Sequence, residues 1–197
     1  SQALKDNTAL KFSVITGCLR ISKESIFTGT NNFVADTIAD ERFSSFFGFT
    51  DEEVRTLLEN TGNLEYFDRI KKWYDGYCFG KTEIYCPWDV LCYLNKLAFE
   101  SESEPENFWE NTSHNDIIRT FLSCEGMDMT DSFEKLLASE TIEVNITENL
   151  TYENLTDSEE NLWSVLYLTG YLTKDIKNPV SGKTKAFLKI PNAEIMD

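Results

Sequence analysis

The first residues with a chemical role to consider are Thr16, Gly17 and Arg20, which follow a short apolar run. Residues 11–17 (K-F-S-V-I-T-G) have the near-continuous hydrophobicity of a strand buried on both faces of a parallel sheet. Open α/β sheets bind their ligands beyond the carboxyl ends of such strands. There a threonine can sense a γ-phosphate, and an arginine can stabilise the charge that moves in phosphoryl transfer. The alternative is that Thr16 ends the strand and Arg20 forms a surface ion pair.

Other residue patterns offer little enzymatic chemistry. The sequence contains no G-x-x-x-x-G-K-[ST], and therefore no glycine loop for phosphates, no lysine for the β/γ-phosphates and no hydroxyl for Mg²⁺. His114 is the only histidine, and no G-x-S-x-G nucleophile pattern occurs. We therefore expect no catalytic residue, no metal site and no cofactor in this chain by itself.

The cysteines and the apolar runs bear on the compartment. Five cysteines without a C-x-x-C pair fit reduced cytoplasmic thiols better than a disulfide framework. No apolar run approaches the roughly 20 residues of a membrane span, and residues 1–7 lack a signal-peptide stretch. The alternative, a secreted glycoprotein, would use the four N-x-S/T triplets at Asn111, Asn145, Asn149 and Asn154. We expect a cytoplasmic protein without membrane contact.

The net charge disfavours broad binding to nucleic acid. The chain has 34 acidic and 18 basic residues and a formal charge of -16, which repels a phosphate backbone over most of the surface. Four aromatic residues could form a stacking platform for single strands, but their acidic neighbours favour packing in the core. These residues are Trp73, Tyr74, Tyr77 and Trp88.

Five lysines gather near the C-terminal end of this sequence, on a predicted hairpin. They are Lys174, Lys177, Lys183, Lys185 and Lys189. A wing that touches a phosphate backbone would have this composition. A solvated hairpin whose lysines protect an edge strand would have it as well, and we favour that interpretation.

The elements that position these residues are predicted to be mainly helical with minor β-structure. Thr50 and Glu53 form a capping box, so a helix begins there and ends near Gly62. A second helix is predicted over 64–74 and a hairpin over 77–85.

The next helix is expected to begin at Pro87, because a fixed φ and a missing N–H are harmless in a first helical turn. An acidic linker follows over 100–107. The remaining pattern consists of three helices, one strand and a terminal hairpin, which together outline a winged-helix module. The ranges are 115–122, 131–138 and 157–169 for the helices, 141–146 for the strand, and 171–176 with 185–190 for the hairpin.

Seven segments resemble, in the same order, the AAA-ATPase-like family of bacterial and archaeal proteins, and together they run through essentially the whole chain. They are F-S-V-I-T-G-C-L-R-I-S-K-E-S-I-F-T-G-T-N-N (12–32), F-F-G-F-T-D-E-E-V (46–54), W-Y-D-G-Y (73–77), I-Y-C-P-W-D-V-L (84–91), F-W-E-N-T-S-H-N-D-I-I (108–118), L-T-G-Y-L-T (168–173) and I-P-N-A-E-I (190–195).

The resemblance implies a P-loop NTPase core that binds ATP and Mg²⁺, a helical lid and a winged-helix-like segment, commonly followed by a PD-(D/E)XK nuclease-like domain. This chain would be the C-terminal portion of the ATPase-like region, without Walker A and Walker B. The implied parts are the final strand of the α/β core (1–31), the lid (32–99), the linker (100–107) and the winged-helix-like module (108–197). Pro87 resembles the lid proline that packs against the nucleotide base; the alternative is simple helix capping.

Our first hypothesis is therefore a nucleotide-responsive lid and winged-helix relay to an attached effector, inactive alone. Its partners would be the N-terminal ATPase core of the same chain and a C-terminal nuclease-like domain, and the pattern allows a homo-oligomer. The rival is an acidic protein–protein interaction module without a nucleotide role, and a DNA-binding winged helix comes third. A strand at 11–17 without its sheet favours the first hypothesis, and we expect residues before about 32 to be loosely held or paired with another copy.

Overall fold

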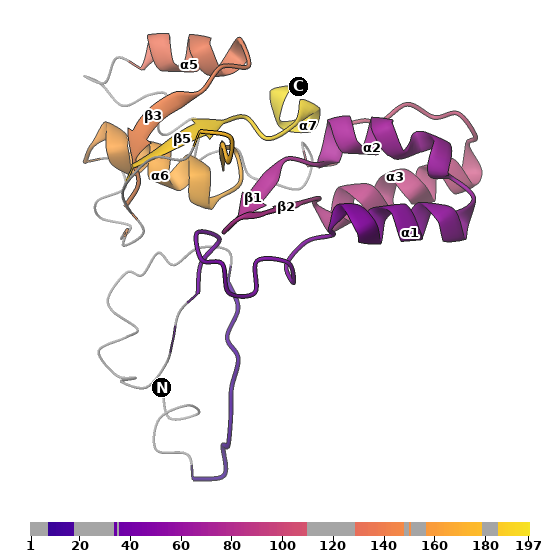
Figure 1. The fold of residues 1–197 in the computed structure, drawn as a ribbon, viewed down its shortest axis with the longest axis horizontal. Coiled ribbons are helices and arrows are strands. Elements are labelled where there is room, and N and C mark those ends of the chain that lie inside the picture. Colours follow the sequence, from indigo (N-terminus) through magenta and orange to yellow (C-terminus); the bar gives the residue numbers. More distant parts are fainter. Residues whose placement is uncertain are drawn as a thin grey trace.

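The computed structural model describes residues 8–17, 34, 36–109, 129–147, 150, 157–178 and 185–197, which contain α-helices and two small antiparallel sheets. Figure 1 shows helices α1, α2 and α3 grouped at one end, beside the hairpin of β1 and β2. We call these elements the helical module. Their bounds are α1 Asp51–Thr61, the 3₁₀ turn η2 Leu64–Tyr66, α2 Phe67–Tyr74, β1 Tyr77–Phe79, β2 Thr82–Ile84 and α3 Pro87–Phe99.

Helix α1 begins and ends where the sequence predicts. The Glu53 amide donates to Thr50 Oγ1 at 3.3 Å, and the Thr50 amide donates to Glu53 Oε2 at 2.8 Å, which completes the capping box. Gly62 closes the helix in the left-handed region with φ 72°, and its amide donates to the Glu59 carbonyl. Val54 and Leu58 lie one turn apart and are fully buried, so α1 packs through a single face.

The core of the helical module is rich in tyrosine. The Tyr74 ring lies 6.0 Å from the Tyr93 ring and 5.9 Å from the Phe108 ring, between centroids, within the range of favourable aromatic pairs. Core packing is thus confirmed for Tyr74, and Tyr77 is buried as well. It is wrong for Trp88, which is exposed on α3, because that position faces away from the buried side of the helix.

The acidic segment over 100–107 packs along helices α2 and α3 of the helical module. The Tyr93 hydroxyl donates to the Ser103 carbonyl at 2.7 Å, and the Tyr74 hydroxyl donates to the Glu106 carbonyl at 3.0 Å. Pro105 is buried. Two core tyrosines thus hold this segment against α2 and α3 through their polar ends.

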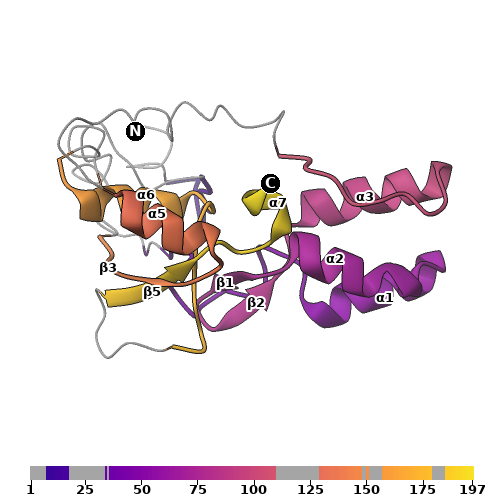
Figure 2. The same ribbon diagram turned by 90° about the horizontal axis from the view of Figure 1, so that it is seen from above.

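The C-terminal module contains the second sheet, helices α5 and α6, and the short helix α7, which follows β5 in the chain and packs on α2 of the helical module. Strand β5 lies in the middle of a three-stranded antiparallel sheet, with β3 and β4 on either side. Helix α6 contacts the sheet and supplies much of the module's core (Figures 1 and 2). The bounds are α5 Thr130–Leu137, β3 Ile142–Asn145, α6 Glu159–Leu168, β4 Thr173–Lys174, β5 Lys185–Lys189 and α7 Ala193–Met196.

The predicted elements of the C-terminal module are largely confirmed. The helix and strand expected over 131–138 and 141–146 correspond to α5 and β3, and the helix expected over 157–169 corresponds to α6. The terminal hairpin forms as predicted. The helix expected over 115–122 lies outside the described residues, so the complete winged-helix outline stays a prediction.

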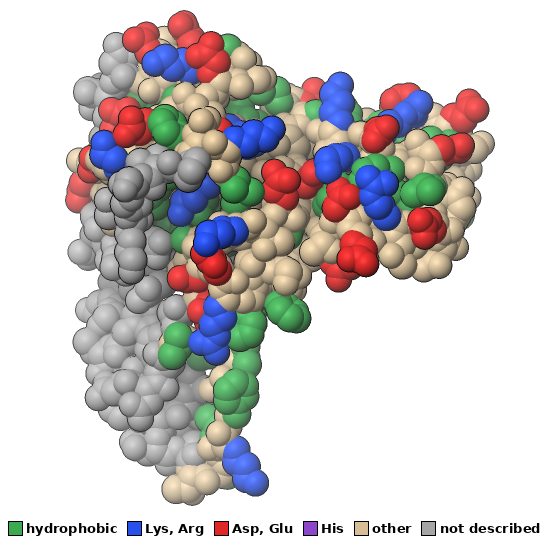
Figure 3. Space-filling view, in the orientation of Figure 1, with side chains coloured by type: hydrophobic (Ala, Val, Ile, Leu, Met, Phe, Trp, Pro, Cys, Tyr) green, Lys and Arg blue, Asp and Glu red, His purple; other side chains and the backbone are tan. Residues whose placement is uncertain are grey.

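The idea that the lysines protect an edge strand is wrong for Lys185 and Lys189, because β5 is the central strand of its sheet. Lys185 pairs instead with Glu143 on the neighbouring strand at 3.0 Å. The Lys174 ammonium lies 4.9 Å from the centroid of the Tyr167 ring. On the face in Figure 3, basic side chains lie next to acidic ones across the described residues. Lys183 lies outside the described residues.

Residues 8–17 lie outside both sheets. Phe12, Val14 and Ile15 are exposed, and Figure 1 shows the segment as an extended trace apart from the helices. A strand needs neighbours to pair its backbone groups, and the described part of the chain supplies none for this segment. A P-loop core is therefore not seen among the described residues. Within those same residues, no helix has the length and apolar composition to cross a membrane.

Candidate functional site: a buried carboxyl pair at the joint between the modules

Four of the family-like segments meet where the two modules touch, a region that we call the joint. They contribute Gly76, Asp89, Trp109 and Glu194. Asp89 lies in the first turn of α3 and Glu194 lies in α7, and neither residue has any exposed surface. A fully buried carboxylate is rare unless it is paired. The joint therefore contains two buried carboxyl groups whose burial needs an explanation.

The segment that follows Asn107 supplies donors to both carboxyl groups. Trp109 Nε1 donates to Asp89 Oδ2 at 3.1 Å. The amides of Phe108 and Trp109 donate to Glu194 Oε1 at 2.8 and 3.3 Å. In addition, Asn107 Nδ2 donates to the Glu194 carbonyl at 3.1 Å. One short segment thus connects α3 to α7.

The two carboxyl groups are near enough to shift one another's pKa. Neither Asp89 Oδ1 nor Glu194 Oε2 has a hydrogen-bond donor among the described residues, and the two carboxyl groups lie close enough to bond once one of them carries a proton. The Cys86 thiol also lies beside Asp89. Two ionised carboxylates cannot donate to each other, so such a pair holds one proton between them. Burial and the neighbouring Asp89 charge raise the pKa of Glu194 to about 8. At neutral pH, therefore, Glu194 is the protonated partner and donates to Asp89.

Close backbone packing surrounds the pair. Gly76 has φ 101°, and a side chain there would collide with the Pro191 carbonyl. The Cys78 amide on β1 donates to Thr173 Oγ1 on β4 at 2.8 Å, within the buried region. The hairpin of the helical module therefore lies directly on the C-terminal module, and glycine is required for this approach.

The arrangement suits a mechanical role better than a catalytic one. Both carboxyl groups are inaccessible to a substrate, and their partners are main-chain amides and an indole. With a proton shared between the two carboxyl groups, such a buried polar cluster fixes the relative position of the elements that contribute to it. We therefore regard Asp89 and Glu194 as positioning residues.

The structure separates the residues that the sequence suggested for nucleotide contact. Thr16 and Gly17 are exposed in the extended segment, and a Cβ on Gly17 would meet no atom within 4 Å. Arg20 lies outside the described residues. Pro87 occupies the first position of α3 as predicted and is partly buried, two residues before Asp89. Figure 1 shows α3 well apart from residues 8–17.

The carboxyl pair was not predicted from the sequence, although both residues stand in apolar surroundings. Asp89 lies one turn before the buried Tyr93, on the apolar side of its helix. Glu194 stands between Ala193 and Ile195 in a short apolar context. Acidic residues on an apolar helix face indicate buried carboxylates, but nothing in the sequence shows that these two are partners.

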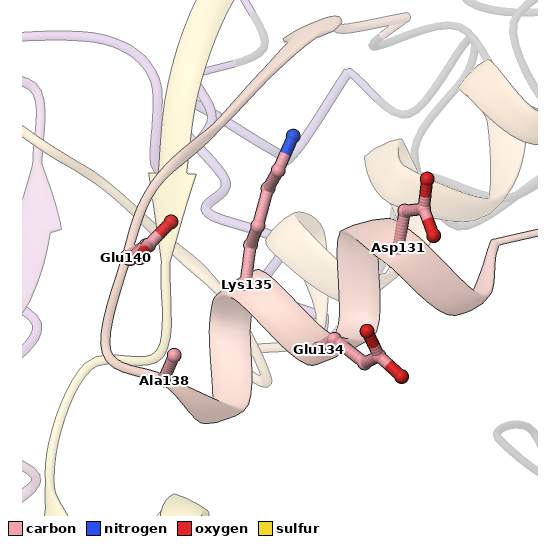
Figure 4. A pocket seen from close by; sticks show the side chains of 5 residues that line it. All are labelled: Asp131, Glu134, Lys135, Ala138 and Glu140. Atoms are coloured by element: carbon pink, nitrogen blue, oxygen red, sulfur yellow. The ribbon is translucent and has the colours of Figure 1, made fainter.

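A concavity beside α5 does not resemble a binding site. It has a volume of about 400 Å³ and is lined by Asp131, Glu134, Lys135, Ala138 and Glu140. Figure 4 shows the charged side chains projecting in different directions instead of converging. Among the described residues, no group of three or more His, Cys, Asp or Glu side chains is arranged to hold a metal ion.

The comparisons with known proteins give one relative. The chain is 26% identical over 195 residues to a protein of Azotobacter chroococcum mcd 1 that is described as an uncharacterized protein in the vnfD 5' region. The match covers 98% of this chain and 34% of the relative, so the chain spans about a third of that protein's length. No protein-family model matches the chain, and no solved structure matches it. The AAA-ATPase-like assignment therefore stays a prediction.

Proposed function

We propose that this chain is the lid and winged-helix-like part of an AAA-like ATPase, and that it relays the nucleotide state to an attached effector. The joint supports this proposal, because a relay requires the helical module and the C-terminal module to move together. Asp89 belongs to the helical module, Glu194 belongs to the C-terminal module, and both are fully buried in one hydrogen-bonded cluster.

In this proposal the input lies at the start of α3. Pro87 contacts the nucleotide base there, and it begins the same helical turn that carries Asp89. A shift of that turn acts on Glu194 through the shared proton and through Trp109. A buried cluster with satisfied hydrogen bonds transmits such a shift because it resists deformation.

The chemistry would belong to the rest of the protein. ATP and Mg²⁺ would be held by an N-terminal P-loop core of the same polypeptide, in the cytoplasm, and the effector would be a nuclease-like domain. The P-loop is required because this chain contains no phosphate-binding glycine loop of its own. Thr16, Gly17 and Arg20 would complete the core's nucleotide site.

Hydrogen exchange on the full-length parent protein tests the proposal. Addition of ATP and Mg²⁺ is expected to change the protection of the Phe108 and Trp109 amides, which bind Glu194. Pro87→Ala is expected to weaken ATP binding, whereas Pro105→Ala, which changes a buried proline of the returning segment, leaves it unchanged. Two results contradict the proposal. One is a full-length protein without a P-loop, and the other is protection of the Phe108 and Trp109 amides that ATP and Mg²⁺ do not change.

The rival function is an acidic protein–protein interaction module without a nucleotide role. It is favoured by the apolar side chains that α3 exposes to solvent. The two functions differ in one measurement: the rival predicts that ATP has no effect on the joint in the full-length protein.

A further inference from the structure

Helix α3 is apolar on two sides, and the described residues cover only one of them. Val90, Tyr93, Leu94 and Leu97 form its buried side. On the other side Trp88, Leu91 and Phe99 are 57%, 48% and 83% exposed. A helix of a globular protein normally shows one apolar side and one polar side, and a helix that is apolar all round is buried.

The exposed residues lie on one line. Trp88, Leu91, Asn95 and Phe99 follow the spacing i, i+3, i+7 and i+11, which stays on a single face of an α-helix. We call them the α3 stripe; only Asn95 is polar. At 1.5 Å per residue the stripe is roughly 16 Å long, or about three helical turns. Several large apolar side chains exposed along one helix face mark an interaction site.

The charges beside the stripe indicate its occupant. Glu100 and Glu102 follow Phe99 directly and are exposed, and neither forms an ion pair among the described residues. The next two acids differ, because Glu104 pairs with Arg69 at 3.0 Å and Glu106 pairs with Lys96 at 2.7 Å. The end of the stripe therefore carries uncompensated negative charge on a chain whose total is -16.

We propose that the α3 stripe docks a basic amphipathic helix of a partner protein. Such a helix places its apolar side chains on Trp88, Leu91 and Phe99, and its lysines or arginines next to Glu100 and Glu102. A second copy of this chain fits less well, because it would bring another net charge of -16 to the contact. The docking surface is independent of the proposed nucleotide role.

Three labelled peptides of about 15 residues test the proposal by fluorescence anisotropy at about 0.15 M salt. The first is a Leu/Lys amphipathic helix, the second is the matching Leu/Glu helix, and the third is a Ser/Lys peptide of the same charge without an apolar side. The Leu/Lys peptide is expected to bind with a dissociation constant on the order of micromolar, and at least about tenfold more tightly than the other two.

Variants of this chain locate the contact. Trp88→Ser and Phe99→Ser are each expected to weaken Leu/Lys binding about tenfold, because a few large aromatic side chains carry most of the affinity of an interface. Leu137→Ser is the matched control, since Leu137 is 64% exposed on α5 in the other module. It should leave the affinity unchanged. All three positions are exposed, so the circular-dichroism spectra of the variants should equal that of the unsubstituted chain.

Three results would overturn the proposal. One is a Ser/Lys peptide that binds as tightly as the Leu/Lys peptide, which would show that the affinity comes from net charge alone. Another is Leu/Lys binding that Phe99→Ser does not weaken. The third is sedimentation of the free chain as a dimer that Phe99→Ser converts to a monomer, which would assign the α3 stripe to a second copy.

Discussion

Asp89 and Glu194 lie far apart in the sequence, yet their carboxyl groups are close enough to shift one another's pKa, and neither residue is exposed. Asp89 belongs to the first turn of α3, and Glu194 belongs to the short helix α7. The proton between them and the donors from residues 108 and 109 make this contact the most specific link between the two modules.

Two substitutions of Glu194 should separate hydrogen bonding from charge. Glu194→Gln keeps an acceptor for the Phe108 amide and gains a permanent donor for Asp89, so its free energy of unfolding near pH 6 should lie within about 1 kcal/mol of the parent value. Glu194→Ala leaves the Phe108 amide without its acceptor and takes the proton of Glu194 away from Asp89, which keeps only Trp109 Nε1 and its other neighbours, so it should cost about 2–4 kcal/mol. Urea unfolding measures both. Equal losses for the two variants would show that the shared proton is not part of the joint.

The contribution of Glu194 to the stability of the chain should fall as the pH rises from about 4.5 to about 8. The folded state keeps a proton on Glu194 up to a pKa of about 8, whereas the unfolded chain loses it near the ordinary value of 4.5. The folded state thus binds more protons between these values, so this contribution to the free energy of unfolding is complete below about pH 4.5 and is lost as the pH rises through about 8. The difference between the parent chain and Glu194→Gln, measured from pH 5 to about pH 9, should show a decline of a few kcal/mol. A difference that is flat over this range would contradict the assigned proton.

Gly76 should not tolerate alanine. Its φ of 101° is unfavourable for any residue with a Cβ, and that Cβ would collide with the Pro191 carbonyl. Gly76→Ala should therefore cost about 2 kcal/mol or more. Gly62→Ala is the matched control, because Gly62 also has positive φ but no atom lies within 4 Å of its Cβ position. A thermal melt in which the two variants lose equal stability would show that the close approach at Pro191 is unimportant.

Duplex DNA should not bind at physiological salt. Lys185 already pairs with Glu143 and Lys174 stacks on Tyr167, so few lysines of the hairpin can reach phosphates. The remaining acidic surface opposes approach within a screening length of about 8 Å. A titration of labelled duplex at low and moderate salt checks this, since each real phosphate contact adds roughly -0.9 to the log–log salt slope. Submicromolar affinity that the double change Lys183→Glu and Lys185→Glu abolishes would show that the hairpin binds DNA.

Local signals determined much of the secondary structure. The capping box at Thr50, the helix end near Gly62 and the first-turn position of Pro87 all appear in the structure as predicted. These features depend on interactions between residues a few positions apart, so the sequence contains them directly. The strand expected over 11–17 depends instead on neighbouring strands, and the described residues include none for it.

The candidate site was decided by the tertiary structure. The sequence places Asp89 one turn before Tyr93 in the helix expected from Pro87, and it places Glu194 between Ala193 and Ile195. It did not determine that they share a proton, or that β5 is the central strand of its sheet, or that Trp88 faces solvent. The physical reason is that pairing between distant segments depends on how whole elements pack, and the pKa of a carboxyl group depends on the neighbours and the burial which that packing creates.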